Sequence, residues 1–210
     1  MIAIFYLVPK PYAQKISAWF IRLLVLLPVR VKGTPDPEAQ MFLLNHQSDI
    51  DIGIMETITS KDLAWVAKKE LFDIPFFGLV LKLPKDIALE RESKTALVKL
   101  IKECKERIDQ GRVITIFPEG TRTETGKMKP FKPGAKIVAD KFALKVQPVV
   151  LIATAWHFSN KRKHFRSGSV TAVYLDSFVA DKNDPEWLNN LHTTMQKVYD
   201  DELANTPRYR

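Results

Sequence analysis

The strongest constraint on the fold is a series of short apolar runs separated by segments with helical spacing. Residues 40–44, 113–117 and 146–153 have the length and composition of buried strands. Residues 96–108 place apolar side chains along one helical face, and a second helix is expected over 133–142. Because strands and helices alternate, we expect an α/β domain with a mixed, mostly parallel sheet flanked by helices.

Weaker signals complete this pattern. Shorter strands are expected at 62–66, 87–89 and 169–178. A last helix is predicted to begin at Asp184-Pro185, followed by apolar residues at helical spacing. Residues 29–32 alternate apolar and basic side chains, and the Gly- and Pro-containing stretch 33–37 separates them from 40–44. This arrangement predicts a β-hairpin.

The N-terminal residues favour contact with a membrane. Residues 1–8 and 12–27 are strongly apolar, but each stretch is shorter than the roughly 20 residues that span a bilayer. Lys15 and Arg22 share one helical face and leave the other faces apolar, as in a helix that lies in the interface. We therefore expect membrane-associating helices over 1–28 and a catalytic domain over 29–210, the alternative for 12–27 being a buried core helix.

The charge balance points to an anionic partner. The formal net charge is +8, which suits either nucleic acid or a phospholipid surface. No nucleic-acid recognition motif is present, so an anionic phospholipid membrane is expected and nucleic acid is not. Cys104 is the single cysteine, so a disulfide framework is excluded, and its helical position makes it a core residue.

A histidine and an acid follow the first buried run. His46 comes directly after residues 40–44, and Asp51 follows five residues later. If Asp51 lies in the first turn of a helix, its carboxylate can fold back to one ring nitrogen of His46 and make the other nitrogen a base. The alternative is a surface histidine followed by an unrelated acid. Ser48 or Asp49 is expected to cap the helix.

The remaining candidate ligands show no metal-binding pattern. His157, His164 and His192 have no paired spacing, and the acids at 49 and 51 lack a matching ligand cluster. We therefore expect neither a metal nor a cofactor. No serine or cysteine is arranged as a nucleophile, so the histidine would deprotonate the substrate's own hydroxyl.

A second motif follows the run 113–117. Phe117-Pro118-Glu119-Gly120-Thr121-Arg122 is a turn that ends in an arginine, whose guanidinium can bind a phosphate through two hydrogen bonds. Lys127, Lys129 and Lys132 follow closely, which makes the segment electropositive. Phosphate binding is the expected role of this motif.

These motifs together resemble the glycerophospholipid acyltransferases, and most closely the bacterial 1-acyl-sn-glycerol-3-phosphate acyltransferases. The resemblance runs in order from about residue 28 to residue 153. It is carried by Asn45-His46-x-x-x-x-Asp51, Lys68-Lys69-Glu70-Leu71, residues 74–78, Phe117–Arg122, residues 130–135 and residues 147–150.

The resemblance implies a mechanism and a substrate. His46, held by Asp51, would take the proton from the sn-2 hydroxyl of lysophosphatidic acid, which then attacks the thioester of acyl-CoA or acyl carrier protein. The product would be phosphatidic acid. By the same resemblance the acceptor's phosphate site would comprise Lys68, Arg91, Glu119, Gly120, Thr121 and Arg122, with Glu119 and Gly120 shaping it.

Several expectations attach to this resemblance. Leu89-Glu90-Arg91 stands where the family usually has an Ile-Asp-Arg-like run, and the N-terminus is short for the family. The resemblance implies a location at the cytoplasmic face of the inner membrane. Alternatives are acylation of another lysophospholipid or lyso-aminolipid, and a non-catalytic module that binds anionic lipid. The basic cluster at 161–166 would contact lipid headgroups, the acidic carrier protein or only solvent.

Overall fold

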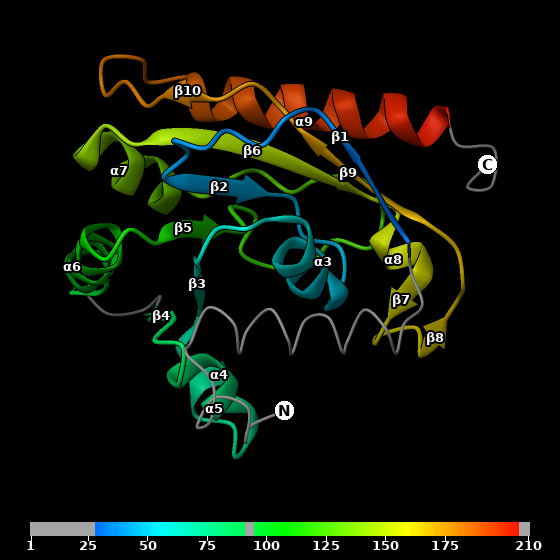
Figure 1. The fold of residues 1–210 in the computed structure, drawn as a ribbon, viewed down its shortest axis with the longest axis horizontal. Helices are drawn as coiled ribbons and strands as arrows, with labels where there is room; N and C mark the ends of the chain where they lie inside the picture. Colours follow the sequence, from blue (N-terminus) through cyan, green and yellow to red (C-terminus); the bar gives the residue numbers. More distant parts are fainter. Residues whose placement is uncertain (1–27, 91–94, 206–210) are drawn as a thin grey trace.

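The computed structural model describes residues 28–90 and 95–205 (Figure 1). Its centre is an eight-stranded sheet with the order β1-β9-β6-β2-β5-β3-β4, and β10 pairs with β6. The strands are β1 Val29–Lys32, β2 Met41–Leu44, β3 Leu63–Lys68, β4 Ile87–Leu89, β5 Val113–Ile116, β6 Lys145–Ile152, β9 Val170–Tyr174 and β10 Phe178–Val179. Strands β6, β2, β5, β3 and β4 run parallel, whereas β9 and β10 pair with β6 in antiparallel fashion. The predicted mixed, mostly parallel α/β sheet is confirmed.

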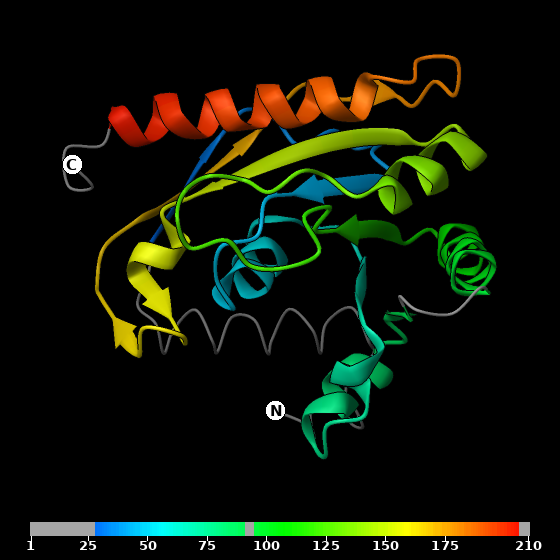
Figure 2. The same ribbon diagram turned by 180° about the vertical axis from the view of Figure 1, so that it is seen from behind.

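Helices cover both faces of this sheet. They are α3 Ile50–Ile58, α4 Lys69–Phe72, α5 Phe77–Lys82, α6 Ala96–Asp109, α7 Pro133–Phe142, α8 Thr154–His157 and α9 Trp187–Ala204. Met41 and Leu43 of β2 join the core under α6, α7 and α9, whereas Phe42 and Leu44 join the core under α3. Figures 1 and 2 show α9 lying along one side of the sheet and α3 on the other.

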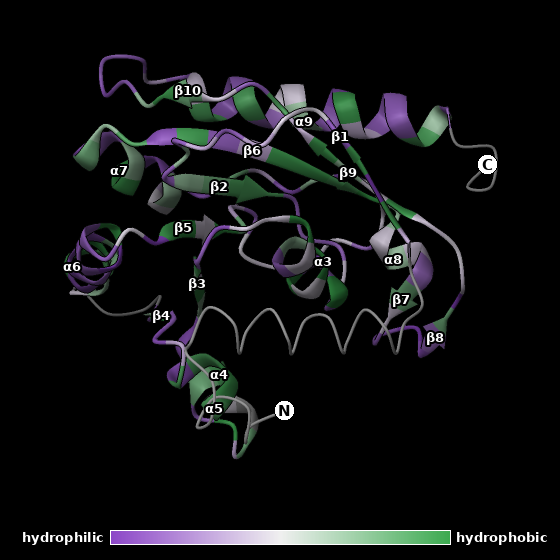
Figure 3. Ribbon diagram, in the orientation of Figure 1, coloured by the Kyte–Doolittle hydropathy of each residue, from purple (hydrophilic) through white to green (hydrophobic). Residues whose placement is uncertain are grey.

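The hydrophobic pattern explains which strands are central. All residues of β2 and β5 are buried, as expected for strands covered on both faces. Figure 3 shows apolar residues concentrated on the sheet, while α6 and α9 carry apolar and polar residues side by side. Burial of these strands therefore fixes the position of the loops that follow them.

The predicted hairpin between residues 29–32 and 40–44 is wrong. Strand β1 pairs in parallel with β9 at the sheet edge, and β2 lies between β5 and β6. The physical reason is burial: β1 is largely exposed and fits an edge, whereas fully buried β2 needs a neighbour on each side. The turn residues at 33–37 instead belong to a connection that passes from β1 at the sheet edge, past β9 and β6, to β2.

Other differences are small or lie outside the described residues. The structure adds the short helices α4, α5 and α8, and a short hairpin of β7 Phe158–Ser159 and β8 His164–Phe165, none of which was expected. The predicted membrane-associating segment 1–28 lies outside the described residues except for Pro28. Among the described helices, none combines the length and apolarity needed to cross a bilayer.

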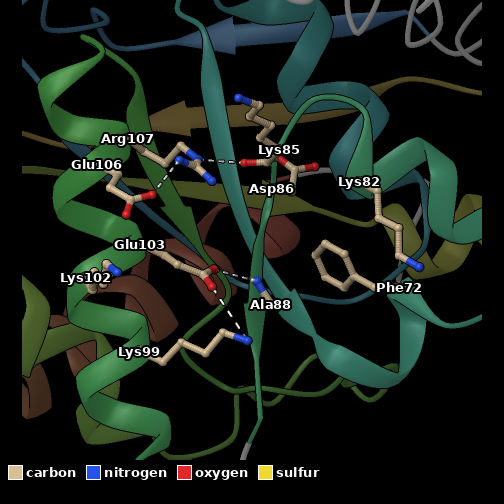
Figure 4. A pocket seen from close by; sticks show the side chains of 10 residues that line it. All are labelled: Phe72, Lys82, Lys85, Asp86, Ala88, Lys99, Lys102, Glu103, Glu106 and Arg107. Atoms are coloured by element: carbon tan, nitrogen blue, oxygen red, sulfur yellow. Dashed lines mark hydrogen bonds and ion pairs between the residues drawn. The ribbon is translucent and has the colours of Figure 1, made fainter.

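A buried carboxyl beside β4 makes stability depend on pH. Asp86 lies at the groove between β4 and α6 (Figure 4), and its carboxylate accepts a hydrogen bond of 3.1 Å from the backbone N–H of Trp65. Burial raises the pKa of Asp86 to about 8, although this hydrogen bond and the Arg112 guanidinium favour the charged form. The folded protein therefore keeps a proton on Asp86 that the unfolded chain releases above its ordinary pKa of 3.8.

We expect the free energy of unfolding to fall as the pH rises from about 4 to about 8, by at most ~1.4 kcal/mol per pH unit from this group. Asp86→Asn removes this contribution, so the variant should gain stability relative to the wild type as the pH increases. Urea denaturation at several pH values measures the difference. A difference that does not change with pH would contradict the assignment.

Candidate active site

The carboxyl ends of the parallel strands bring the predicted site residues to one edge of the sheet. Strand β2 leads into His46, β5 leads into the segment 117–122, and β3 ends at Lys68. Because these strands are parallel neighbours, their following loops meet at the same edge. Two motifs that are far apart in the sequence thus become adjacent.

His46 and Asp51 form the predicted contact. Nδ1 of His46 lies 2.8 Å from Oδ2 of Asp51, which is fully buried in the first turn of α3. The same oxygen accepts hydrogen bonds from the backbone N–H groups of Gln47 and Ser48, at 2.7 and 2.9 Å. A carboxylate oxygen only accepts, so Nδ1 carries the proton and Nε2 offers its lone pair. No described residue bonds to Nε2.

Aromatic stacking fixes the plane of the histidine. The ring of His46 stacks on Phe117 with 3.8 Å between centroids, and Trp65 stacks on Phe117 at 5.3 Å. The indole N–H of Trp65 donates to Glu56 at 2.8 Å. The His46 side chain is 17% exposed, which leaves one edge of the ring accessible. The imidazole is therefore held in one orientation before a substrate binds.

Glu119 connects the segment that contains His46 to the segment that follows β5. It is buried, and its Oε1 accepts the backbone N–H of His46 at 2.8 Å. Its Oε2 accepts the hydroxyl of Thr123 and the backbone N–H of Lys129, each at 2.8 Å. The backbone N–H of Thr123 also donates to the carbonyl of His46 at 2.8 Å. These contacts can shape the site, the role that the resemblance implied for Glu119.

Asn45 belongs to the motif that carries the resemblance, but its structural role could not be deduced from the sequence. It is fully buried, its amide N–H donates to the carbonyl of Leu151 at 2.9 Å, and its amide oxygen accepts the N–H of Leu151 at 2.7 Å. This pair of bonds ties the end of β2 to β6 and fixes the start of the His46 loop. Besides its place in the motif, the signal in the sequence was a polar amide directly after a buried strand.

Ser48 is placed as a structural residue. Its hydroxyl donates to the carbonyl of Phe158 at 2.6 Å, so its proton is not directed at a substrate. Of the two expected caps of α3, Asp49 occupies the N-cap position without a side-chain bond to the helix, whereas Oγ of Ser48 accepts the backbone N–H of Ile50, the first helical residue, at 3.4 Å. The backbone N–H groups of Gln47 and Ser48, which precede the helix, are bound by Asp51.

Arg122 lies beside the histidine motif. Its guanidinium forms an ion pair with Asp49, and the two side chains are 43% and 47% exposed. Gly120 adopts a φ of 67°, which makes the turn that presents Thr121 and Arg122. Exposed ion pairs contribute little free energy, so a phosphate can replace Asp49 at low cost.

Of the other two predicted cationic phosphate ligands, the structure describes one. Lys68 is exposed at the carboxyl end of β3. Arg91 lies outside the described residues.

No group of three His, Cys, Asp or Glu side chains within 28–90 and 95–205 could hold a metal ion. The groove of Figure 4 is lined by residues of α4, α5, β4 and α6 and by the two residues 85 and 86 before β4, and it contains none of the predicted site residues.

Comparisons with known proteins identify a family and several relatives of this chain. The model of the family described as Acyltransferase matches residues 29–152. A 1-acyl-sn-glycerol-3-phosphate acyltransferase from Helicobacter pylori is 44% identical over 168 residues, which cover 80% of this chain and 71% of the relative. A protein of the same name from Haemophilus influenzae is 29% identical over 167 residues, which cover 77% of this chain and 69% of the relative.

A solved structure shares the fold. The crystal structure of the 1-acyl-sn-glycerophosphate (LPA) acyltransferase PlsC from Thermotoga maritima matches with a TM-score of 0.72 and 24% identity, covering 90% of this chain and 76% of that one. The matching family model and the 44% identical relative define the chain as an acyl-transfer enzyme. The chain belongs to the acyltransferase family.

Proposed function

We propose that this enzyme transfers a fatty acyl group from a thioester to the sn-2 hydroxyl of lysophosphatidic acid and so forms phosphatidic acid. The proposal rests mainly on the contact between Nδ1 of His46 and Asp51, because it leaves Nε2 of His46 with a free lone pair at the carboxyl ends of the strands. The names of the bacterial relatives, which are 1-acyl-sn-glycerol-3-phosphate acyltransferases, support this acceptor.

The reaction steps follow from the tautomer of His46, in which Nδ1 carries the proton and Nε2 can accept one. Nε2 of His46 takes the proton of the acceptor hydroxyl while Nδ1–H stays bonded to Asp51, whose charge stabilises the imidazolium. The acceptor oxygen forms a bond to the thioester carbonyl carbon. The tetrahedral intermediate then expels the thiolate, which receives the proton from Nε2. The ester and a free thiol result, and no enzyme ester is formed, in keeping with the hydroxyl of Ser48 being bonded to Phe158.

Acceptor selection rests on cations at the same edge of the sheet. Arg122 can exchange Asp49 for the phosphate, and exposed Lys68 at the end of β3 supplies a second positive charge. Arg91, Gly120 and Thr121 complete the proposed set, and Glu119 holds the loop. A phosphate monoester attracts these cations more strongly than a headgroup whose phosphate carries a second, cationic substituent.

The donor and the setting complete the proposal. Acyl-CoA or acyl carrier protein supplies the thioester, and each proton step has a named group, so the reaction requires no cofactor. Because lysophosphatidic acid resides in membranes, the enzyme would act at the surface of an anionic bilayer, on its cytoplasmic face.

The test is acyl transfer by detergent-purified enzyme to lysophosphatidic acid, glycerol 3-phosphate and lysophosphatidylcholine. We expect product from lysophosphatidic acid, and we expect Arg122→Ala to raise the KM for that acceptor by about ten- to a hundred-fold. Asp49→Asn is the matched control, because it removes the competing carboxylate and should leave KM equal or lower. Preference for lysophosphatidylcholine, or an unchanged KM in Arg122→Ala, would overturn the acceptor assignment.

A further inference from the structure

A corner of the molecule formed by residues 154–166 combines exposed aromatic side chains with a cluster of positive charge. It contains α8, β7 and β8, and we call it the docking corner. Trp156 is 41% exposed and Phe165 is 51% exposed. The cations around them are Lys161, Arg162, Lys163 and Arg166, all exposed. We propose that the docking corner inserts Trp156 and Phe165 into the interface of an anionic phospholipid bilayer.

The chemistry of this corner matches a lipid surface. Tryptophan and other aromatic rings favour the headgroup region, and each lysine or arginine near an anionic leaflet adds attraction. The Arg166 guanidinium lies 4.3 Å from the centre of the Trp156 ring, so cation and ring would enter the interface together. An acidic protein partner could also use the positive charge, and the second test below distinguishes it from a lipid surface.

The corner is preformed. His157 is fully buried, its Nδ1 lies 3.0 Å from the carbonyl of Arg166, and its backbone carbonyl accepts the N–H of Arg166 at 2.7 Å. Ser159 accepts the backbone N–H of Arg162 at 2.9 Å. Binding to a bilayer would therefore require little ordering of the backbone.

Direct bonds join this corner to the active site. The hydroxyl of Ser48, which lies between His46 and Asp51, donates to the carbonyl of Phe158 at 2.6 Å. Arg162 forms an ion pair of 3.3 Å with Glu124, two residues beyond Arg122. Contact of the corner with a bilayer would thus set the position of the active site relative to an acceptor embedded in that bilayer.

A second apolar projection lies on the same side of the molecule. Leu71, Ile74 and Phe76 in and between α4 and α5 are 36%, 44% and 77% exposed. Figures 1 and 2 both show α4, α5 and the β7–β8 hairpin on the side of the molecule away from α9. Two projections on one side give the molecule a defined orientation on a flat surface.

The first test uses a fluorescent reporter of insertion in the full chain. The native Cys104 is buried, which raises its pKa to about 12, so it should not react with a thiol probe. A polarity-sensitive dye is attached at Phe165→Cys or, as the matched control, at Val179→Cys, which is 59% exposed on β10. With vesicles of phosphatidylglycerol and phosphatidylcholine, we expect a blue shift at 165 and none at 179. Bound protein with no blue shift at 165 would overturn the proposal.

The second test measures the role of charge. Lys161→Glu with Lys163→Glu should weaken binding to these vesicles at least about ten-fold. Lys141→Glu with Lys182→Glu, also exposed, makes the same charge change elsewhere and should weaken it much less. Transfer to vesicle-embedded lysophosphatidic acid should fall with binding, whereas transfer to a soluble short-chain acceptor should not.

Unchanged vesicle binding, with loss of activity only when acyl carrier protein is the donor, would overturn the proposal in favour of that partner. This inference rests in part on the proposed function, but the dye shift and vesicle binding are read without turnover.

Discussion

Replacing His46 by alanine is expected to lower kcat/KM for acyl transfer by about 10³-fold, because the variant has no group to take the proton of the acceptor hydroxyl. The structure gives the reason for a loss in the chemical step: the ring is fixed by Asp51 on one edge and by Phe117 on one face. Initial rates with lysophosphatidic acid and a long-chain thioester measure the effect.

Two controls make this result specific. His192→Ala removes a histidine whose Nε2 contacts the carbonyl of Met128 and which the proposed mechanism does not use, so it should keep kcat within about three-fold. Binding of His46→Ala to anionic vesicles should be unchanged, since His46 lies outside the docking corner. Retention of more than a tenth of the wild-type rate by His46→Ala would refute the role of His46 as the base.

The sequence carried much of the fold because its strongest signals are local. The buried strands and the amphipathic helices α6, α7 and α9 were expected near their observed positions. The partners of β1 could not be deduced in the same way. Turn residues at 33–37 fit a hairpin, whereas the actual partner of β1 is β9, more than a hundred residues later in the chain. Pairing between distant strands depends on which strands are buried on both faces in the complete sheet, and a local sequence pattern does not contain this information.

The site shows the same division between local and distant contacts. The His46–Asp51 contact depends on residues five apart and was deduced from spacing. The support from Asn45 through Leu151, and from Glu119 through the backbone of His46, joins segments 106 and 73 residues apart. Such contacts become visible only when the topology brings the strand ends together. The role proposed for the cluster at 161–166 likewise depended on finding Trp156 and Phe165 exposed beside it.

Asp51→Asn is expected to lower kcat by about 10²- to 10⁴-fold, with a much smaller change in the KM for the acceptor. An asparagine oxygen can still accept the N–H groups of Gln47 and Ser48, which now bond to Oδ2. What the variant loses is the negative charge that stabilises protonated His46 in the transition state. Steady-state kinetics should therefore separate this variant from Arg122→Ala, whose main effect is expected on KM.

A structural explanation of the Asp51 effect must be tested alongside, because this carboxylate is fully buried and binds three N–H groups. Urea denaturation of Asp51→Asn reports how much folding stability is lost, and the kinetics are compared at a temperature where the variant remains folded. A kcat that falls only in proportion to the unfolded fraction would show that Asp51 acts as a loop anchor alone. A large loss in fully folded protein would instead assign the charge of Asp51 to the proton transfer at His46, since the geometry of the loop would then be intact.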